Sequence, residues 1–351
     1  MVVMQNLAVA TFEELEDALR GLDGRFILTG RETARWAIRT GMAGRLTVHV
    51  GEEGGGNFYE GAVHKDAIIL YMPLTAAGIM NFNGHELDAT SLVVVPANGL
   101  AIMKAQTANH AAMLTVPLDI LRSGQRFESR DIAALASAKG VLAVDPGRLA
   151  SLRRITERFA AIEEPLSASA ERVAEEEFMA HILGAVTSST TSSNPKRGRP
   201  WVSREQVLAK ILALLRSAED QILYIEDLCR VTGVSERTLR SVFNEAFGLG
   251  PIRYLRHRRL HLVRAALRAA DPGRNTVAGI ATEFGFWEFG RLAQEYHALF
   301  GERPSQTLGS VKHDGIVFDR KHNLTKHGPG HIQSEARMRA SEHQLPLPPS
   351  S

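Results

Sequence analysis

Apolar and polar residues alternate along the first part of the chain in the way that β-strands require. Leu46, Val48 and Val50 are separated by polar side chains, which is the period of two of a half-buried strand. Three more segments are rich in β-forming residues: AIILYM (67–72), SLVVVP (91–96) and HAAMLTV (110–116). Asn83-Gly84 predicts a hairpin within 79–87, because both residues tolerate a positive φ. Consecutive short strands predict an antiparallel barrel or sandwich.

The pattern becomes helical after Pro117. Five apolar residues recur at steps of three and four after the helix-start signal Asp145-Pro146: Leu149, Leu152, Ile155, Phe159 and Ile162. A second helix is expected over 167–183, with the glutamates at 175–177 on its solvent-facing side. The apolar stripe fits two interpretations, packing against the strands or pairing with a second copy of the chain. Different faces of the helix can serve both.

Two segments lack regularly spaced apolar residues. We expect 186–202, which begins VTSSTTSSNPKRGRP, to be a flexible basic linker, because Ser and Thr alone bury too little surface to offset the entropy of ordering. We expect 311–351, which is rich in His, Lys and Arg and ends in LPLPPSS, to be a disordered tail.

The sequence between linker and tail repeats itself. Leu239, Phe243, Phe247, Gly248 and Pro251 recur 53 positions later as Leu292, Tyr296, Phe300, Gly301 and Pro304. Leu228, Cys229, Gly233 and Val234 recur at an offset of 52 as Ile280, Ala281, Gly285 and Phe286. Because the repeat keeps the spacing of one helix face and its terminal Gly and Pro, we expect two copies of one structural unit.

Each copy has the pattern of a helix-turn-helix. In the first, a short helix over 225–232 is followed by Gly233 in the turn and by Ser235 as the N-cap of a second helix. In the second copy, the second helix is expected over about 288–300. The helix predicted between the copies, 252–270, carries Arg253, Arg256, Arg258, Arg259, Arg264 and Arg268. It would span roughly 27 Å, enough to hold two recognition helices about one DNA turn apart. Its arginines either meet phosphates or support the fold.

The charge distribution favours nucleic acid as partner of the repeated segment. The 351 residues carry a net charge of +2, but residues 1–186 hold 17 basic and 23 acidic side chains, a net −6. Residues 187–310 hold 18 and 12, a net +6. The single cysteine, Cys229, fits a reducing compartment, and no stretch approaches the ~18 apolar residues of a membrane span. We therefore expect a cytoplasmic protein without membrane contact.

The repeat resembles the DNA-binding domain of the AraC/XylS transcription regulators. GVSERTLRSVFNEAFGLGPIRYLRHRRL and IATEFGFWEFGRLAQEYHALFGERPSQTL share a Gly at each turn and a closing FG…P, and a small residue (Cys229, Ala281) precedes each. The resemblance, over about Ile211 to Leu308, implies that 203–310 is an all-α domain of two helix-turn-helix motifs joined by a helix. Residues 1–185 resemble more weakly the cupin-like effector domains of such regulators. The expected fold class is therefore α+β multidomain, with an N-terminal cupin-like antiparallel β-barrel, following helices and the all-α domain.

The resemblance also implies which residues read DNA. It places base readout at Arg237, Arg240 and Ser241 in the first copy, where arginines can make bidentate contacts with guanine. In the second copy the resemblance places base readout at Phe289, Gly290, Ala293 and Gln294. Three of these residues offer no side-chain hydrogen bond, so we expect the first copy to contribute most of the base readout. The predicted DNA-binding residues are Ser235, Arg237, Arg240, Ser241, Arg258, Phe289, Arg291 and Gln294.

Other chemistries are less well supported. The chain has no Walker loop, no G-x-S-x-G and no H-x-H pair of a cupin metal site, so we expect no catalytic residue, resident cofactor or metal site. His322, His327 and His331 have metal-compatible spacing but lie in the predicted tail. Arg197-Gly198-Arg199-Pro200 resembles the core of an AT-hook, whose arginines lie in an A·T minor groove. An ordinary basic linker is the alternative.

These observations predict a sequence-specific transcription regulator. We expect a small-molecule-responsive activator that acts as a homodimer and binds double-stranded DNA and RNA polymerase. An architectural DNA-binding protein without effector response is the first alternative, and a cupin-type enzyme with a DNA-binding module is the second.

Overall fold

The computed structural model of the chain describes residues 5–7, 11–19, 21–30, 36–75, 79–123, 127–191, 204–218 and 221–309. The AT-hook resemblance at Arg197–Pro200, the histidines of the predicted tail and the tail itself lie outside the described residues.

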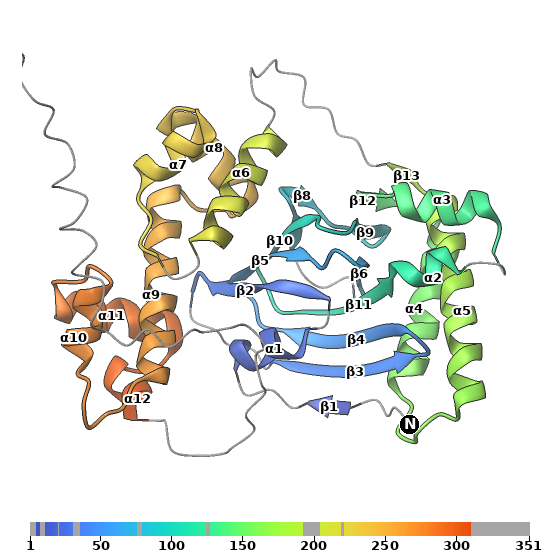
Figure 1. Ribbon diagram of the computed structural model, residues 1–351, viewed down its shortest axis with the longest axis horizontal. Helices are drawn as coiled ribbons and strands as arrows, with labels where there is room; N and C mark the ends of the chain where they lie inside the picture. The colour runs from blue at the N-terminus through green and yellow to red at the C-terminus, as the bar shows by residue number, and fades with distance from the viewer. Residues whose placement is uncertain are drawn as a thin grey trace, which may run out of the picture. The chain divides into compact units, whose positions relative to one another are not determined.

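Two antiparallel β-sheets form the N-terminal half (Figure 1). The first sheet contains, in spatial order, β1 (Gln5–Leu7), β3 (Ala37–Ala43), β4 (Leu46–Glu53), β11 (Asn109–Pro117), β6 (Ala67–Pro73), β9 (Ser91–Val95), β12 (Gly140–Ala143) and β13 (Thr190–Thr191). The second contains β2 (Leu22–Leu28), β5 (Asn57–Val63), β10 (Leu100–Ala105), β7 (Met80–Phe82) and β8 (His85–Glu86). The antiparallel β fold followed by an all-α domain is confirmed. In the described part of the chain the strands make two separate sheets, not one closed barrel.

The local patterns predicted for the strands are present. β4 contains the alternating Leu46, Val48 and Val50, which pack on one face of the sheet. Asn83 and Gly84 have φ angles of 49° and 87° between β7 and β8, as a two-residue hairpin of this kind requires.

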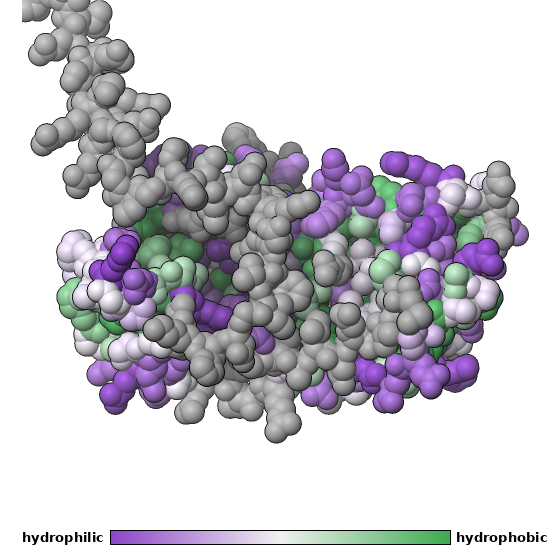
Figure 2. All heavy atoms as spheres, turned by 60° about the horizontal axis from the view of Figure 1, so that its bottom comes forward, coloured by the Kyte–Doolittle hydropathy of each residue, from purple (hydrophilic) through white to green (hydrophobic). Residues whose placement is uncertain are grey.

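Five helices accompany the sheets: α1 (Phe12–Ala18), α2 (Leu118–Arg122), α3 (Ser129–Ser137), α4 (Pro146–Ala160) and α5 (Ala168–Thr187). The carboxylate of Asp145 caps α4 by accepting from the Arg148 N–H at 3.0 Å, and Pro146 is its first residue. The apolar stripe of α4 packs into a core with the first sheet and α5, so this face is occupied within the chain. Figure 2 shows hydrophilic side chains over the outer surface at the right-hand edge, where these helices lie.

Seven helices form the rest of the described chain: α6 (Arg204–Ser217), α7 (Ile225–Thr232), α8 (Glu236–Ala246), α9 (Pro251–Ala269), α10 (Val277–Glu283), α11 (Phe289–Phe300) and α12 (Pro304–Gly309). The predicted linker begins later than expected, because α5 continues to Thr187 and β13 pairs with β12. None of the helices described is long and apolar enough to cross a membrane.

The β half and the helices share buried cores. Ile27, Phe58 and Ile102 of the second sheet cluster with α6, α7, α8 and the start of α9. A second cluster joins the inner faces of the two sheets to the apolar residues of α9, α10 and α11. The described residues up to 309 thus belong to one packed unit in which the strands contact the helices that follow α5.

Candidate DNA-binding surface and ligand cavity

The first helix-turn-helix is built as its sequence predicts. α7 ends at Gly233, whose φ of 73° is the left-handed conformation that glycine adopts most readily. Ser235 then caps α8, its hydroxyl accepting from the Thr238 N–H at 3.4 Å. Leu239 and Phe243 are buried on one face of α8, and this burial fixes which face of the helix remains for a partner.

The predicted readers of the first copy lie on that remaining face. Ser235, Arg237, Arg240 and Ser241 are all exposed. Arg240 holds an ion pair with Glu236, 2.5 Å between Nη2 and Oε1, one helical turn away. Such an exposed pair contributes little to stability, so the guanidinium can exchange it for a partner with better geometry.

The second copy presents a different surface. α11 buries Leu292 and Tyr296 and leaves Gln294 exposed. Arg291 is already engaged, with Nε 3.0 Å from Glu295 and Nη1 3.6 Å from Glu288, and hydrogen bonding to Glu295 raises its pKa. This copy therefore offers less free positive charge than the first.

Two aromatic side chains stand exposed where α11 begins. Phe289 is 42% exposed and Trp287 is 73% exposed. We predicted Phe289 but not Trp287, which precedes the helix. The available signal was its place in the repeat, directly after Phe286, which is the counterpart of Val234 in the first copy. Exposed aromatics of this size are uncommon on a surface without a partner.

The structure corrects the prediction that Arg258 contacts DNA. Its side chain is 1% exposed, and its guanidinium donates to the backbone carbonyls of Gln221 at 2.7 Å, Leu215 at 3.3 Å and Ala218. Leu215 and Ala218 lie at the C-terminal end of α6, where carbonyls lack helical partners. Arg258 therefore joins α9 to α6.

Most other arginines of α9 also support the fold. Arg256 pairs with Glu295 at 2.6 Å, and Arg259 lies over the rings of Tyr224 and Phe286. Arg253, by contrast, is exposed. Of the two alternatives for these arginines, phosphate contact or support of the fold, Arg256 and Arg258 follow the second.

A cavity lies between the two sheets. Its walls are mostly apolar and aromatic: Phe26, Tyr59, Ile69, Tyr71, Phe82, Val93, Met103 and Met113 are among them. α1 closes part of it through Leu15. An apolar and aromatic lining with a few polar groups is typical of a small-molecule site.

Among the described residues that line the cavity, Glu53 alone has a carboxyl group. Burial raises its pKa to about 7, and a hydrogen bond from Asn109, 3.4 Å between Nδ2 and Oε2, opposes this shift. An acid in the cavity wall was not predictable here, because Glu53 stands in the polar segment GEEGGG. Its pairing with Asn109 across β4 and β11 encloses it.

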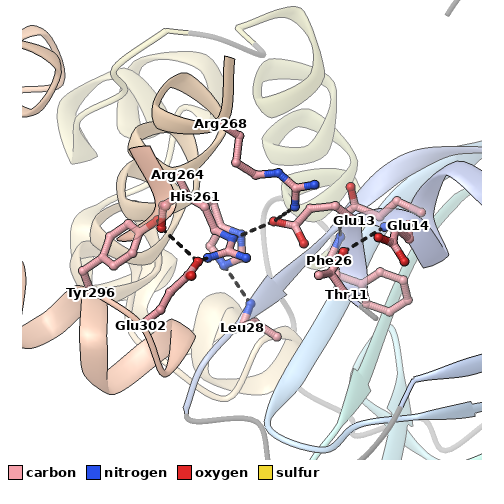
Figure 3. A network of polar contacts seen from close by, with 12 residues as sticks. Thr11, Glu13, Glu14, Phe26, Leu28, His261, Arg264, Arg268, Tyr296 and Glu302 are labelled. Atoms are coloured by element: carbon pink, nitrogen blue, oxygen red, sulfur yellow. Dashed lines mark hydrogen bonds and ion pairs between the residues drawn. The ribbon is translucent and has the colours of Figure 1, made fainter. Parts of the chain in front are cut away.

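Polar contacts join the cavity wall to α9 (Figure 3). Arg264 points from α9 between Glu13 of α1, at 2.6 Å, and Glu302, which follows α11. The Leu28 N–H of β2 donates to Nε2 of His261 at 2.9 Å. Burial lowers the pKa of His261 well below its usual range, so the ring is neutral and can accept this bond.

Comparison with known proteins identifies the second half of the chain. Residues 228–310 match the family model described as a helix-turn-helix domain. Most of the two copies around α9 lies within this match, and this part of the chain is similar to curated transcriptional activators.

Two curated relatives from Pseudomonas putida are named as transcriptional activators. XylDLEGF operon transcriptional activator 2 is 29% identical over 136 residues, which cover 39% of this chain and 86% of that protein. XylDLEGF operon transcriptional activator is 26% identical over 196 residues, which cover 56% of this chain and only 54% of that protein. The solved structure of the AraC-like transcriptional activator CuxR shares 16% identity at a TM-score of 0.40, covering 74% of this chain and 92% of that one.

Proposed function

We propose that this protein is a transcription regulator that reads two adjacent major-groove segments of double-stranded DNA and responds to a small molecule bound between its sheets. One observation carries the DNA-binding part. The two second helices, α8 and α11, lie beside opposite ends of α9 (Figure 1). Both helices bury their apolar faces and have exposed residues in their first turns. α9 has 19 residues, or about 28 Å, which suits two readers one DNA turn apart.

The two readers have different chemistry. Arg237 and Arg240 on α8 are placed to make bidentate contacts with guanine, each worth about 1–3 kcal/mol of discrimination against a wrong base. On α11, Phe289 suits a thymine methyl and Gln294 suits adenine. Ser235 and Ser241 flank the arginines of α8, and Arg291 is left to a phosphate. We infer that the first copy contributes most of the base readout.

Contacts between α9 and the cavity wall support a response to ligand. Leu15 and Phe26 line the cavity, and their elements, α1 and β2, also carry Glu13 and Leu28, which bond to α9. A molecule in the cavity can shift DNA binding only if it binds the two arrangements of α1 and β2 with unequal affinity. Because α1 and β2 contact both the cavity and α9, a ligand-induced shift of these elements would act directly on α9.

We further propose that the protein acts by binding and not by catalysis, as a dimer that activates transcription through RNA polymerase. The names of the relatives support activation. The buried stripe of α4 is not available as a dimer surface, so a dimer would use another face, such as the side of α5 on which Val173 is exposed.

The test is to select DNA sequences bound by the purified chain from a random pool and then measure affinity for the selected site with and without candidate ligands. A regulator of this kind yields a motif with two conserved segments one helical turn apart. An architectural protein would yield no motif and no ligand response.

A further inference from the structure

We propose that the cavity between the sheets takes an apolar amine, bound as its ammonium ion with Glu53 as the counter-charge. The inference deepens the proposed function, because it assumes that this cavity is the effector site and names the class of effector.

Glu53 is placed to contact a ligand in the cavity. Glu53 lies in β4 directly opposite Asn109 of β11, on the face of the sheet that lines the cavity. Asn109 donates to one carboxylate oxygen at a long 3.4 Å, while its own oxygen accepts from the Tyr71 hydroxyl, also at 3.4 Å. Both contacts are at the long end of the hydrogen-bond range. A ligand with strong N–H donors would supply the carboxylate with shorter and better-aligned bonds.

The surroundings of Glu53 favour a positive charge. Tyr71 lines the cavity with Glu53, and the face of a tyrosine ring attracts cations. Phe26, Tyr59 and Phe82 complete an apolar and aromatic wall around the remaining volume. The site therefore combines an acidic group with an apolar and aromatic lining, which is the complement of an amine on a small hydrophobic skeleton.

A carboxylate ligand fits this lining poorly. Among the described residues that line the cavity, none is Lys or Arg, and the titratable groups besides Glu53 are His49, Tyr59 and Tyr71. His49 already bonds the Thr40 hydroxyl through Nδ1 at 2.9 Å. A ligand carboxylate would share a low-dielectric space with Glu53, and two like charges there oppose each other.

The protonation of Glu53 agrees with this assignment. With its pKa near 7, about half of the carboxyl groups are ionised at neutral pH. A bound ammonium ion stabilises the ionised form, so ligand affinity should rise as pH increases through 7 until the amine itself loses its proton. A neutral or anionic ligand would show no such rise.

The experiment uses three probes that differ only in their head group: phenethylamine, phenethyl alcohol and hydrocinnamate. Each is titrated calorimetrically into the purified full-length chain, slightly above neutral pH. The variant is Glu53→Gln, which keeps the shape and removes the charge. The matched control is Glu52→Gln, because Glu52 is the neighbouring residue of β4 and is exposed. Thermal unfolding checks that each variant is folded.

We expect the amine to bind tightest, and Glu53→Gln to weaken it about tenfold or more while Glu52→Gln leaves it unchanged. Tighter binding of hydrocinnamate, equal binding of the alcohol and the amine, an amine affinity indifferent to Glu53→Gln, or no amine binding at millimolar concentration would overturn the assignment.

A DNA-binding measurement with the same probes separates this inference from the proposed function. If hydrocinnamate or the alcohol alters DNA affinity and Ala111→Phe, which fills the cavity, abolishes that effect, the effector site stands and the amine assignment fails. If the amine binds through Glu53 but leaves DNA affinity unchanged, the amine assignment stands and the effector response fails.

Discussion

Arg264 of α9 donates from Nε to Oε1 of Glu13 in α1 at 2.6 Å, and this bond joins the helix between α8 and α11 to an element of the cavity wall. The Arg264 side chain is only 10% exposed. It also pairs with Glu302, and its guanidinium lies 4.8 Å from the centre of the Phe300 ring. Arg268 contacts the same Glu13 oxygen at 3.1 Å. One carboxylate thus holds two arginines of α9.

Replacing Glu13 should loosen this junction. Glu13→Gln removes the charge that faces two arginines, one of them largely buried, and we expect a loss of about 1–3 kcal/mol in the free energy of unfolding. Urea denaturation of the full chain measures it. Glu14→Gln, on the exposed side of the same helix, is the control. Equal losses of unfolding free energy in the two variants would show that the Glu13 contact stabilises the fold no more than an exposed glutamate does.

Replacing Arg258 should destabilise the helix-turn-helix domain and not merely weaken DNA binding. Arg258→Ala leaves three backbone carbonyls without their donor and opens a cavity beside α6, so we expect a loss of about 3–5 kcal/mol. The exposed Arg253→Ala, one turn earlier in α9, should lie within about 0.5 kcal/mol of the parent. A folded Arg258→Ala protein of parental stability with weakened DNA binding would restore the original prediction of a DNA contact.

Glu53 should make stability depend on pH in a defined direction. Its pKa in the folded chain, about 7, is above that of an unfolded glutamate, so the folded state binds more protons between these values. The contribution of Glu53 to the free energy of unfolding is therefore complete below about pH 4.5. It is lost as pH rises through 7, a loss of about 3 kcal/mol. Glu53→Gln should remove this decline. Identical pH profiles of unfolding for parent and variant would contradict it.

The two copies should respond unequally to loss of an arginine. Arg291 is held by Glu288 and Glu295, whereas Arg237 is exposed on the face of α8. We expect Arg237→Ala to lower affinity for the selected DNA site by about 1–3 kcal/mol and to relax one base position. Arg291→Ala should lower affinity less and uniformly across sequences, with a smaller salt slope, as loss of a phosphate contact does. Relaxed base preference in Arg291→Ala would reverse this assignment.

The helix-turn-helix domain could be predicted closely from sequence because its signals are local. Gly233 predicts where α7 ends, and the Ser235 cap predicts where α8 begins. The structure has α7 with the predicted bounds, 225–232. The same holds for Asn83-Gly84 and its hairpin. Such features depend on backbone conformation and helix periodicity, which neighbouring residues determine.

Features that depend on distant partners were not predictable in this way. β2 and β3 were missed because Asp23, Gly24 and Gly41 interrupt their apolar patterns, and pairing with β5 and β4 overrides local preference. Arg258 lies one turn after the buried Tyr254, but only the carbonyls at the end of α6 show what its guanidinium binds. In the sequence, Glu53 has the neighbours of a loop residue. Its place in a strand follows only from the pairing of β4 with β11.

The most direct test of the account is a selection of bound sequences from a random double-stranded DNA pool, performed with the full-length chain and two double variants of equal charge. Arg237→Ala/Arg240→Ala removes the proposed readers, and Arg230→Ala/Arg253→Ala removes two other exposed arginines of the same domain. We expect the parent chain and the Arg230→Ala/Arg253→Ala control to select the same two-segment motif. The Arg237→Ala/Arg240→Ala reader variant should lose the preferred bases of one segment. A parent that selects no motif, or a reader variant that selects the parental motif with parental affinity, would contradict it.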